Sequence, residues 1–372
     1  MSKINIRSPY FITVAETDLT SAILELYIYT GTQVATMDSI TYTLESDAIS
    51  AVVTFEISQL ISDYLDTTFD GVFDSQVVWV NYQLTHFILD SAQTPEAVVQ
   101  LTAFDGYGYF EDLVNPQLSD RLLQTNTTVY VYDNNYFYIA VQQDYIDTIE
   151  IRANGGVVDS QAFTPTTASS DVIRYIGYTN STSDCDDNIN YIFEDRDNYL
   201  FEDANNFIFS GNTVVDEILI TYTDAATQSI SIVPIRESKY TPYRLTFINK
   251  FGALQSIWMF KRTDLALEVE SDSYRSYTYS AAAYSVSSHQ YRNLMVSGKE
   301  TISLNTGFYV ESHNEIFRQL VLSEKIWIDY EGNILPINLK SKELSFKTSL
   351  NDKLINYKLE FEFAYDKINS VY

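Results

Sequence analysis

The sequence contains little of the chemistry that builds metal centres or disulfide frameworks. Its 372 residues include one cysteine, Cys185, and three histidines. A single cysteine cannot form a disulfide within the chain or a cysteine-rich zinc site, and three histidines leave few ligands for a histidine-based metal centre. No run of about 18 apolar residues is present, so no membrane insertion is expected. Residues 1–9 lack the apolar core of a signal peptide, so we expect synthesis in a cytoplasm.

Basic residues are also scarce, and unevenly so. The chain has 23 Lys and Arg against 50 Asp and Glu, a formal net charge of −27. Residues 1–235 hold six basic and 34 acidic residues, a net charge of −28, whereas residues 236–372 hold 17 and 16, a net charge of +1. A strongly acidic surface repels phosphate, which argues against direct nucleic-acid binding and against docking on an anionic membrane. The abrupt change predicts a domain boundary at residues 234–240.

Aromatic residues are abundant, with 30 Tyr and 21 Phe. This composition is typical of half-buried strands, and also of large contact surfaces between subunits. Short strand-like runs lie at residues 22–29, 77–82, 97–103, 128–131, 136–141, 148–152, 218–222 and 230–233. One short helix is predicted among them, because Ile57, Leu60, Ile61, Tyr64 and Leu65 share a helical face.

These patterns predict a mainly β protein with tandem β-sandwich domains and a C-terminal β-rich domain that has a short helix. The predicted limits are residues 1–120, 121–235 and 236–372. In the last domain, residues 244–248 and 253–260 form a predicted hairpin around Gly252, and residues 326–329 and 334–339 form another. Ser312 and Glu315 have the spacing of a helix capping box. Residues 355–363 alternate strictly between apolar and polar, which predicts a strand with one buried face.

One acidic loop has part of a calcium-binding pattern. Asp184, Asp186 and Asn188 could supply oxygen ligands, but Ile189 stands where the pattern needs glycine and Asp195 where it needs glutamate. A solvated acidic loop is therefore favoured over a cation site. Cys185 lies between acids, which disfavour its thiolate form and make it a poor nucleophile.

Other groups that could support catalysis are weak candidates. Asp195, Asp197, Glu202 and Asp203 could supply a carboxylate pair for glycoside hydrolysis, although close acidic pairs are expected by chance in so acidic a chain. His86, His289 and His313 lack metal-ligand spacing, and no phosphate loop or dinucleotide fingerprint is present. We therefore predict no catalytic residue, no metal and no cofactor, and a protein that is not an enzyme.

Three stretches carry a resemblance to a known family. They are residues 6–11 (IRSPYF), residues 239–255 (KYTPYRLTFINKFGALQ), and the C-terminal residues 351–357 (NDKLINY) with 361–369 (FEFAYDKIN). Together they resemble a virion structural protein of tailed phages of Bacteroidetes, including the crAss-like group. The resemblance reaches both ends of the chain, and its motifs look structural. It implies a tail-hub or tail-associated assembly protein, with a neck-ring or head-attached virion protein as the nearest alternative.

The resemblance also implies partners and a location. The expected partners are further copies of the chain in a ring or hub, and other phage tail or neck proteins, in a virion tail assembled from subunits made in the bacterial host cytoplasm. An acidic half could line a channel through which DNA passes without sticking, or could face outward. Acidic surfaces repel each other, so residues 236–372 are expected to supply most contact between subunits. Two other classes remain open: a carbohydrate- or receptor-binding module that stacks sugars on Trp79, Trp258 or Trp327, and a tail depolymerase.

Overall fold

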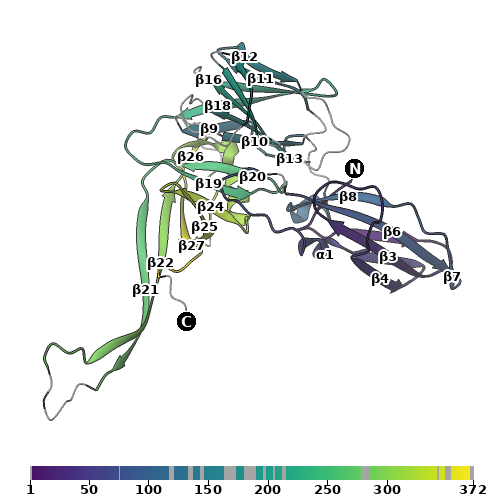
Figure 1. Ribbon diagram of the computed structural model, residues 1–372, viewed down its shortest axis with the longest axis horizontal. Helices are drawn as coiled ribbons and strands as arrows, with labels where there is room; N and C mark the ends of the chain where they lie inside the picture. Colours follow the sequence, from purple (N-terminus) through teal and green to yellow (C-terminus); the bar gives the residue numbers. More distant parts are fainter. Residues whose placement is uncertain are drawn as a thin grey trace. The chain divides into compact units, whose positions relative to one another are not determined.

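The computed structural model is built almost entirely of strands (Figure 1). It describes residues 2–74, 76–116, 121–132, 137–142, 146–162, 173–179, 190–195, 198–203, 206–211, 215–277, 283, 285–341, 343–347 and 353–368. The predicted fold class is confirmed: the protein is mainly β, with tandem β-sandwich domains followed by a β-rich C-terminal region with a short helix.

The first sandwich packs a large sheet against a small one. The elements are β1 (Ser2–Asn5), β2 (Phe11–Ala15), β3 (Leu19–Tyr29), β4 (Tyr42–Asp47), β5 (Val52–Glu56), α1 (Ser58–Ser62), β6 (Val78–Ile88), β7 (Ser91–Ala92), β8 (Val99–Phe104) and the 3-10 turn η1 (Phe110–Asp112). The large sheet has the order β1-β8-β6-β3-β4, with β7 paired to β6, and the small sheet is β2-β5. Alternate residues of β3, such as Leu24, Leu26 and Ile28, enter a core shared with β5 and α1. The helix predicted from residues 57–65 is therefore present, and it buries Ile61.

The second sandwich has two five-stranded sheets. Its strands are β9 (Thr128–Tyr132), β10 (Phe137–Gln142), β11 (Ile146–Ala153), β12 (Gly156–Ala162), β13 (Ile173–Thr179), β14 (Asn190–Asp195), β15 (Asn198–Asp203), β16 (Asn206–Gly211), β17 (Glu217–Tyr222) and β18 (Thr227–Ile235). The sheet orders are β10-β13-β16-β15-β14 and β12-β11-β17-β18-β9. Ile139 and Ile176 of the first sheet share one core with Ile149, Ile218 and Ile230 of the second.

The C-terminal region contains a seven-stranded sheet. Its elements are β19 (Tyr243–Ile248), β20 (Leu254–Met259), β21 (Asp264–Arg275), β22 (Tyr291–Asn305), β23 (Tyr309–Val310), the 3-10 turn η3 (Glu311–His313), α2 (Asn314–Leu322), β24 (Ile326–Tyr330), β25 (Asn333–Leu339), β26 (Leu354–Ile355) and β27 (Lys358–Phe363). The order is β20-β19-β24-β25-β27-β22-β21, and β23 pairs with β26. Both predicted hairpins form, and Gly252 and Gly332 take the positive φ angles that their turns require.

The strict alternation near the C-terminus predicts the burial correctly. Ile355, Tyr357, Leu359, Phe361 and Phe363 are all buried. The expected single strand is nevertheless split into β26 and β27, because Tyr357 exchanges its backbone bonds with Thr306 rather than with a neighbouring strand. The Tyr357 amide donates to Thr306 Oγ1 at 2.9 Å, and its carbonyl accepts from the Thr306 amide at 2.9 Å.

The predicted capping box is wrong. Ser312 lies inside η3 and not in the extended conformation that an N-cap requires, since α2 begins only at Asn314. The Glu315 carboxylate accepts a hydrogen bond from the Tyr109 hydroxyl at 2.6 Å. A long-range partner has therefore replaced the local one that the sequence suggested.

The chain divides into two compact units. Unit 1 comprises residues 1–236, 246–257 and 315–323, and unit 2 comprises residues 237–245, 258–314 and 324–372. The division runs through β19 and β20. Unit 1 thus takes up a hairpin and a helix from the near-neutral part of the sequence. The predicted domain limits at residues 120 and 235 stay predictions.

Candidate functional site

The structure does not bring together the acidic residues that the sequence suggested as cation ligands or as a catalytic carboxylate pair. Some of them lie outside the described residues, and Asp195 lies apart from Glu202 and Asp203. Residues 184–189 and Asp197 lie outside the described residues. Asp195 ends β14, whereas Glu202 and Asp203 end β15. The backbone register pairs Asp195 with Asn198, and Asn190 with Glu202. Asp195 and Glu202 therefore stand at opposite ends of their hairpin, which is not the close arrangement that glycoside hydrolysis uses.

The three histidines are widely separated along the fold. His86 lies on β6, with its Nδ1 atom 3.6 Å from Glu96 Oε1. His313 is buried in η3 beside the Tyr309 ring, and His289 is exposed. Within the described ranges, no group of three or more His, Cys, Asp or Glu side chains is placed to hold a metal ion.

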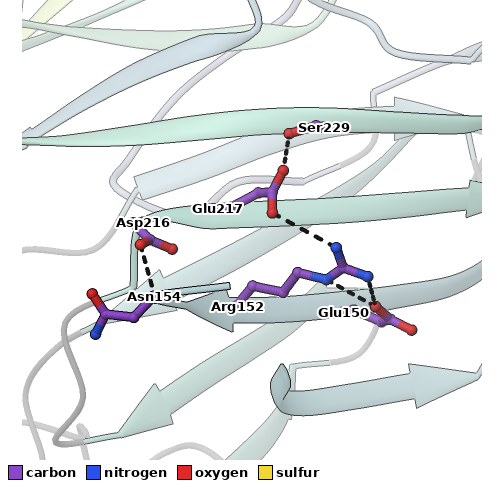
Figure 2. Close-up of polar contacts among 6 residues, drawn as sticks. All are labelled: Glu150, Arg152, Asn154, Asp216, Glu217 and Ser229. Atoms are coloured by element: carbon purple, nitrogen blue, oxygen red, sulfur yellow. Dashed lines mark hydrogen bonds and ion pairs between the residues drawn. The ribbon is translucent and has the colours of Figure 1, made fainter. Parts of the chain in front are cut away.

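A compact polar cluster lies on one face of the second sandwich (Figure 2). The Arg152 guanidinium on β11 contacts Glu150 Oε2 at 2.6 Å and Glu217 Oε2 on β17 at 3.8 Å. Ser229 on β18 donates to the other oxygen of Glu217, so the cluster crosses three neighbouring strands. The Arg152 guanidinium occupies the space between the two carboxylates. It acts as a cross-strand tie on a partly exposed face, where each such pair contributes about 0.2–1 kcal/mol.

A dense long-range polar network lies in unit 1. Five segments meet there: residues 5–8, 105–109, 121–126, 249–255 and 315–322. We refer to this network as the junction. It contains residues 6–8 of the first resemblance stretch and the hairpin turn of the second. Those stretches therefore meet in space although they are more than two hundred residues apart in the sequence.

Asn249 organises the turn at the centre of the junction. Its Oδ1 atom accepts from the backbone amides of Phe251 and Ala253 at 2.9 and 3.1 Å. Its Nδ2 atom donates to the Leu123 carbonyl at 2.8 Å and to Gln255 Oε1 at 3.1 Å. The side chain is completely buried, and these four bonds satisfy its full hydrogen-bonding capacity.

Helix α2 binds the same turn through Gln319. The Gln319 Oε1 atom accepts from the Lys250 amide at 3.3 Å, and its Nε2 atom donates to Thr125 Oγ1 at 2.8 Å and to Glu315 Oε1 at 3.1 Å. Gln319 is buried, and its neighbours Ile316 and Leu320 are buried on the same helix. One short helix therefore fixes the hairpin turn and the segment that leads into β9.

Aromatic rings and cations cover the outer side of the junction. The Arg7 guanidinium lies 4.7 Å from the centroid of the Tyr107 ring, and Lys250 Nζ lies 5.3 Å from that of Tyr109. Arg318 pairs with Glu315 at 3.3 Å and also lies over the Tyr109 ring. Such cation–π contacts contribute about 0.5–2 kcal/mol each, depending on burial.

The junction also shifts the titration of its tyrosines. Burial raises the pKa of Tyr107 to about 12. Burial and the hydrogen bond to Glu315 raise the pKa of Tyr109 far above its ordinary value. Both hydroxyls therefore remain protonated at neutral pH, when Tyr109 serves as a hydrogen-bond donor to Glu315.

Two glycines allow the backbones in the junction to approach closely. A Cβ atom on Gly106 would lie 2.9 Å from the Lys250 carbonyl oxygen, and one on Gly252 would lie 2.8 Å from the Asp105 amide nitrogen. Any larger residue would push the hairpin turn away from β8. Together with the buried hydrogen bonds of Asn249 and Gln319, this close approach holds the segments of the junction in register.

A different kind of surface extends from unit 2. Strands β21 and β22 pair over twelve residues of β21 and run together beyond the rest of their sheet (Figure 1). We call the segment from residue 264 to residue 305, which contains these two strands, the arm. Leu265, Leu267 and Val269 on β21 are each 55% exposed, and they alternate along one face of the strand. No pattern in the sequence had predicted this surface.

The tryptophans proposed as sugar-stacking platforms are placed differently from one another. Trp79 and Trp258 are buried, and the Trp79 indole donates to the Gly31 carbonyl at 2.8 Å. The positions of Trp258 and Trp327 within hairpin strands favour core packing for both rings; this is confirmed for Trp258, whereas Trp327, in β24, is only partly buried. Two of the three rings are therefore unavailable as exposed platforms.

Comparison with known proteins adds little. No family model and no curated protein matches the sequence. One matching solved structure, of fibronectin(III)-like modules of CbhA from Clostridium thermocellum, is 10% identical and has a TM-score of 0.17. The match covers 64% of this chain and 92% of that one, and at this TM-score it supports no argument. Among the residues that the structure describes, no helix has the length and apolarity needed to cross a membrane.

Proposed function

We propose that this chain is a non-enzymatic structural subunit of a tailed phage virion, with a tail hub or tail assembly protein as the first choice. It acts by fitting against further copies of itself and against other tail or neck proteins. The proposal begins from the resemblance of the three stretches at residues 6–11, at 239–255, and at 351–357 with 361–369. It gains support from the roles that these residues take in the fold.

The observation that carries the proposal is the contrast between the junction and the arm. In the junction, Asn249 and Gln319 are buried and direct their polar groups to other parts of the protein. The arm, by contrast, holds apolar side chains in water. Soluble proteins expose contiguous apolar surface mainly where another macromolecule covers it. An exposed apolar strand face of this kind is suited to assembly.

The charge distribution favours the same conclusion. Residues 1–235 carry a net charge of −28 and would repel the same region of another copy. Residues 236–372, which include the arm, are near neutral. We infer that this region supplies most of the contact between subunits. The acidic region is then left to face solvent or a channel through which DNA passes.

Two alternatives are weighed against this proposal. A neck-ring or head-attached protein would use the same surfaces at another place in the virion. A carbohydrate- or receptor-binding module is disfavoured by the burial of Trp79 and Trp258, since buried rings cannot stack on sugars. A depolymerase would need a carboxylate pair in a cleft, and the Glu150 and Glu217 carboxylates instead share Arg152.

The proposal is tested by looking for the protein in particles. Purified virions should contain this chain in a fixed, multiple copy number by quantitative mass spectrometry, and antibody labelling should place it on the tail or neck. Cross-linking within the particle should join copies mainly through residues 236–372. Absence from virions, or turnover of a host polysaccharide by the purified chain, would refute the proposed function.

A further inference from the structure

The arm is a two-stranded ribbon over much of its length. Strand β27 pairs with β22 only at residues 301–305, and the Lys367 amide adds one bond, at 2.7 Å, to the Gly298 carbonyl. Within the described residues, the ladder of β22 from 291 to 297 is formed with β21 alone. An isolated two-stranded ribbon is marginally stable in water unless one face packs on something else. One face of the arm therefore needs another surface packed against it.

One face of the arm is apolar. Cross-strand pairs share a face, so Leu265, Leu267, Val269 and Ser271 lie on the same side as Val296, which is opposite Ser271. Leu265, Leu267 and Val269 are each about half exposed, and Val296 is 37% exposed. We call Leu265, Leu267, Val269 and Val296 the stripe. Glu300 is opposite Leu267 and therefore lies on this same face, where its carboxylate forms an ion pair with Lys367 at 2.9 Å.

The other face of the arm is acidic. Glu268, Glu270 and Asp272 alternate along it, opposite Lys299, Ser297 and Met295 respectively. If two copies of β21 paired edge to edge in antiparallel registers centred on residues 266 to 272, acidic side chains would stand opposite acidic side chains. A two-fold axis at Val269, for example, sets Glu268 against Glu270 of the partner subunit. Like charges directly opposite one another destabilise a sheet, and an acidic edge strand opposes such pairing.

Face-to-face packing avoids this repulsion. If the stripes of two arms meet, both acidic faces point away from the contact and into water. The sequence between the two strands, residues 276–290, contains no charged residue and is rich in Ser and Tyr. This composition is typical of contact surfaces that gain area at low entropic cost. The arm as a whole, residues 264–305, has five acidic and three basic residues, so two arms approach with little repulsion although the chain carries −27.

We propose that the stripe docks on the stripe of a second copy of this chain, so that two arms pack face to face like the layers of a small sandwich. This inference rests on the proposed function, since it names the surface through which the subunits associate. Two observations favour a second copy as the occupant. A two-fold contact places two stripes of equal length against each other. It also leaves the Glu268, Glu270 and Asp272 side chains of both arms, six in all, in contact with water.

The first test changes the stripe and measures the mass of the full chain. The double variant Leu267→Glu/Val269→Glu adds two negative charges to the stripe. The matched control, Ala266→Glu/Lys299→Gln, changes the charge equally on the opposite face. Native mass spectrometry over a dilution series should show the stripe variant weakening the two-copy contact by roughly tenfold or more. The control should stay within about threefold of the unaltered chain. Circular dichroism checks that both variants fold.

The second test locates the contact directly. In a Cys185→Ser background, a Leu267→Cys chain should be linked into dimers by a short bis-maleimide, whereas a Glu270→Cys chain should not. Equal cross-linking at both positions, or equal dissociation of both charge variants, would overturn the arm contact while leaving a virion role intact. An unaltered chain that stays monomeric would also overturn it. Absence from virions is the separate result that refutes the proposed function. Capture of a different virion protein by Leu267→Cys, in place of a second copy, would reject the two-fold contact.

Discussion

Asn249 gives the sharpest prediction about the fold, because its four hydrogen bonds connect segments that are distant in the sequence. The change Asn249→Ala removes two acceptor bonds to the amides of Phe251 and Ala253, and two donor bonds to Leu123 and Gln255. Three of these partners are backbone groups of buried residues. A buried polar group left without a partner costs about 1–3 kcal/mol. The expected loss in the free energy of unfolding is therefore roughly 3–6 kcal/mol.

The assay is urea unfolding of the full chain, followed by near-ultraviolet circular dichroism and by the fluorescence of Trp79, which is buried in unit 1. With a urea dependence of about 1–3 kcal/mol per M, the midpoint of the unit 1 transition should fall by at least roughly 1 M. The control is Gln59→Ala, which truncates an exposed amide on α1 and should change stability by less than about 0.5 kcal/mol. A loss below about 1 kcal/mol in Asn249→Ala would show that the junction is not the lock described here.

Three further predictions concern unit 1. Gly252→Ala should lower the stability of unit 1 by about 1 kcal/mol or more, because φ at this position is +78° and the new Cβ atom would lie 2.8 Å from the Asp105 amide nitrogen. Urea unfolding measures this loss. An unchanged midpoint would contradict the close approach of the two backbones. Tyr175→Phe should cost about 1–2 kcal/mol by leaving the buried Leu254 amide without its acceptor at 2.9 Å, and a neutral change would count against it. Because burial raises the pKa of Tyr107 to about 12 from an unfolded value near 10, the unfolded state loses this proton first, and stability should fall as pH rises from about 10 to 12. Tyr107→Phe should remove up to about 2 kcal/mol of that decline, and an identical pH dependence in the variant would exclude Tyr107 as its source.

Local patterns in the sequence predicted the strands that alternate against a core. Residues 355–363 show this most clearly, since period-two burial requires only that one face be apolar. The turn at Gly252 was equally readable, because few other residues accept its φ angle. The pattern could not show that the Tyr357 amide would bond to Thr306 and split the strand, since that partner is 51 residues away.

The arm was missed for a different physical reason. Leu265, Leu267 and Val269 alternate as a strand should, but residues 276–290 contain no Gly, Pro or Asn to indicate the turn that closes the hairpin. The junction was missed because its contacts are non-local. Tyr109 and Glu315 are separated by 206 positions, and a capping box offered a plausible local partner for Glu315. Composition and periodicity predict local structure, whereas side chains that meet only in the folded chain require the topology.

The central claim, that the chain works by self-association, is tested most directly by its native mass in solution. The account predicts that the purified full-length protein forms multiples of the 42.6 kDa chain, and that these species dissociate on dilution. A protein that remains a 42.6 kDa monomer at every concentration would contradict the claim.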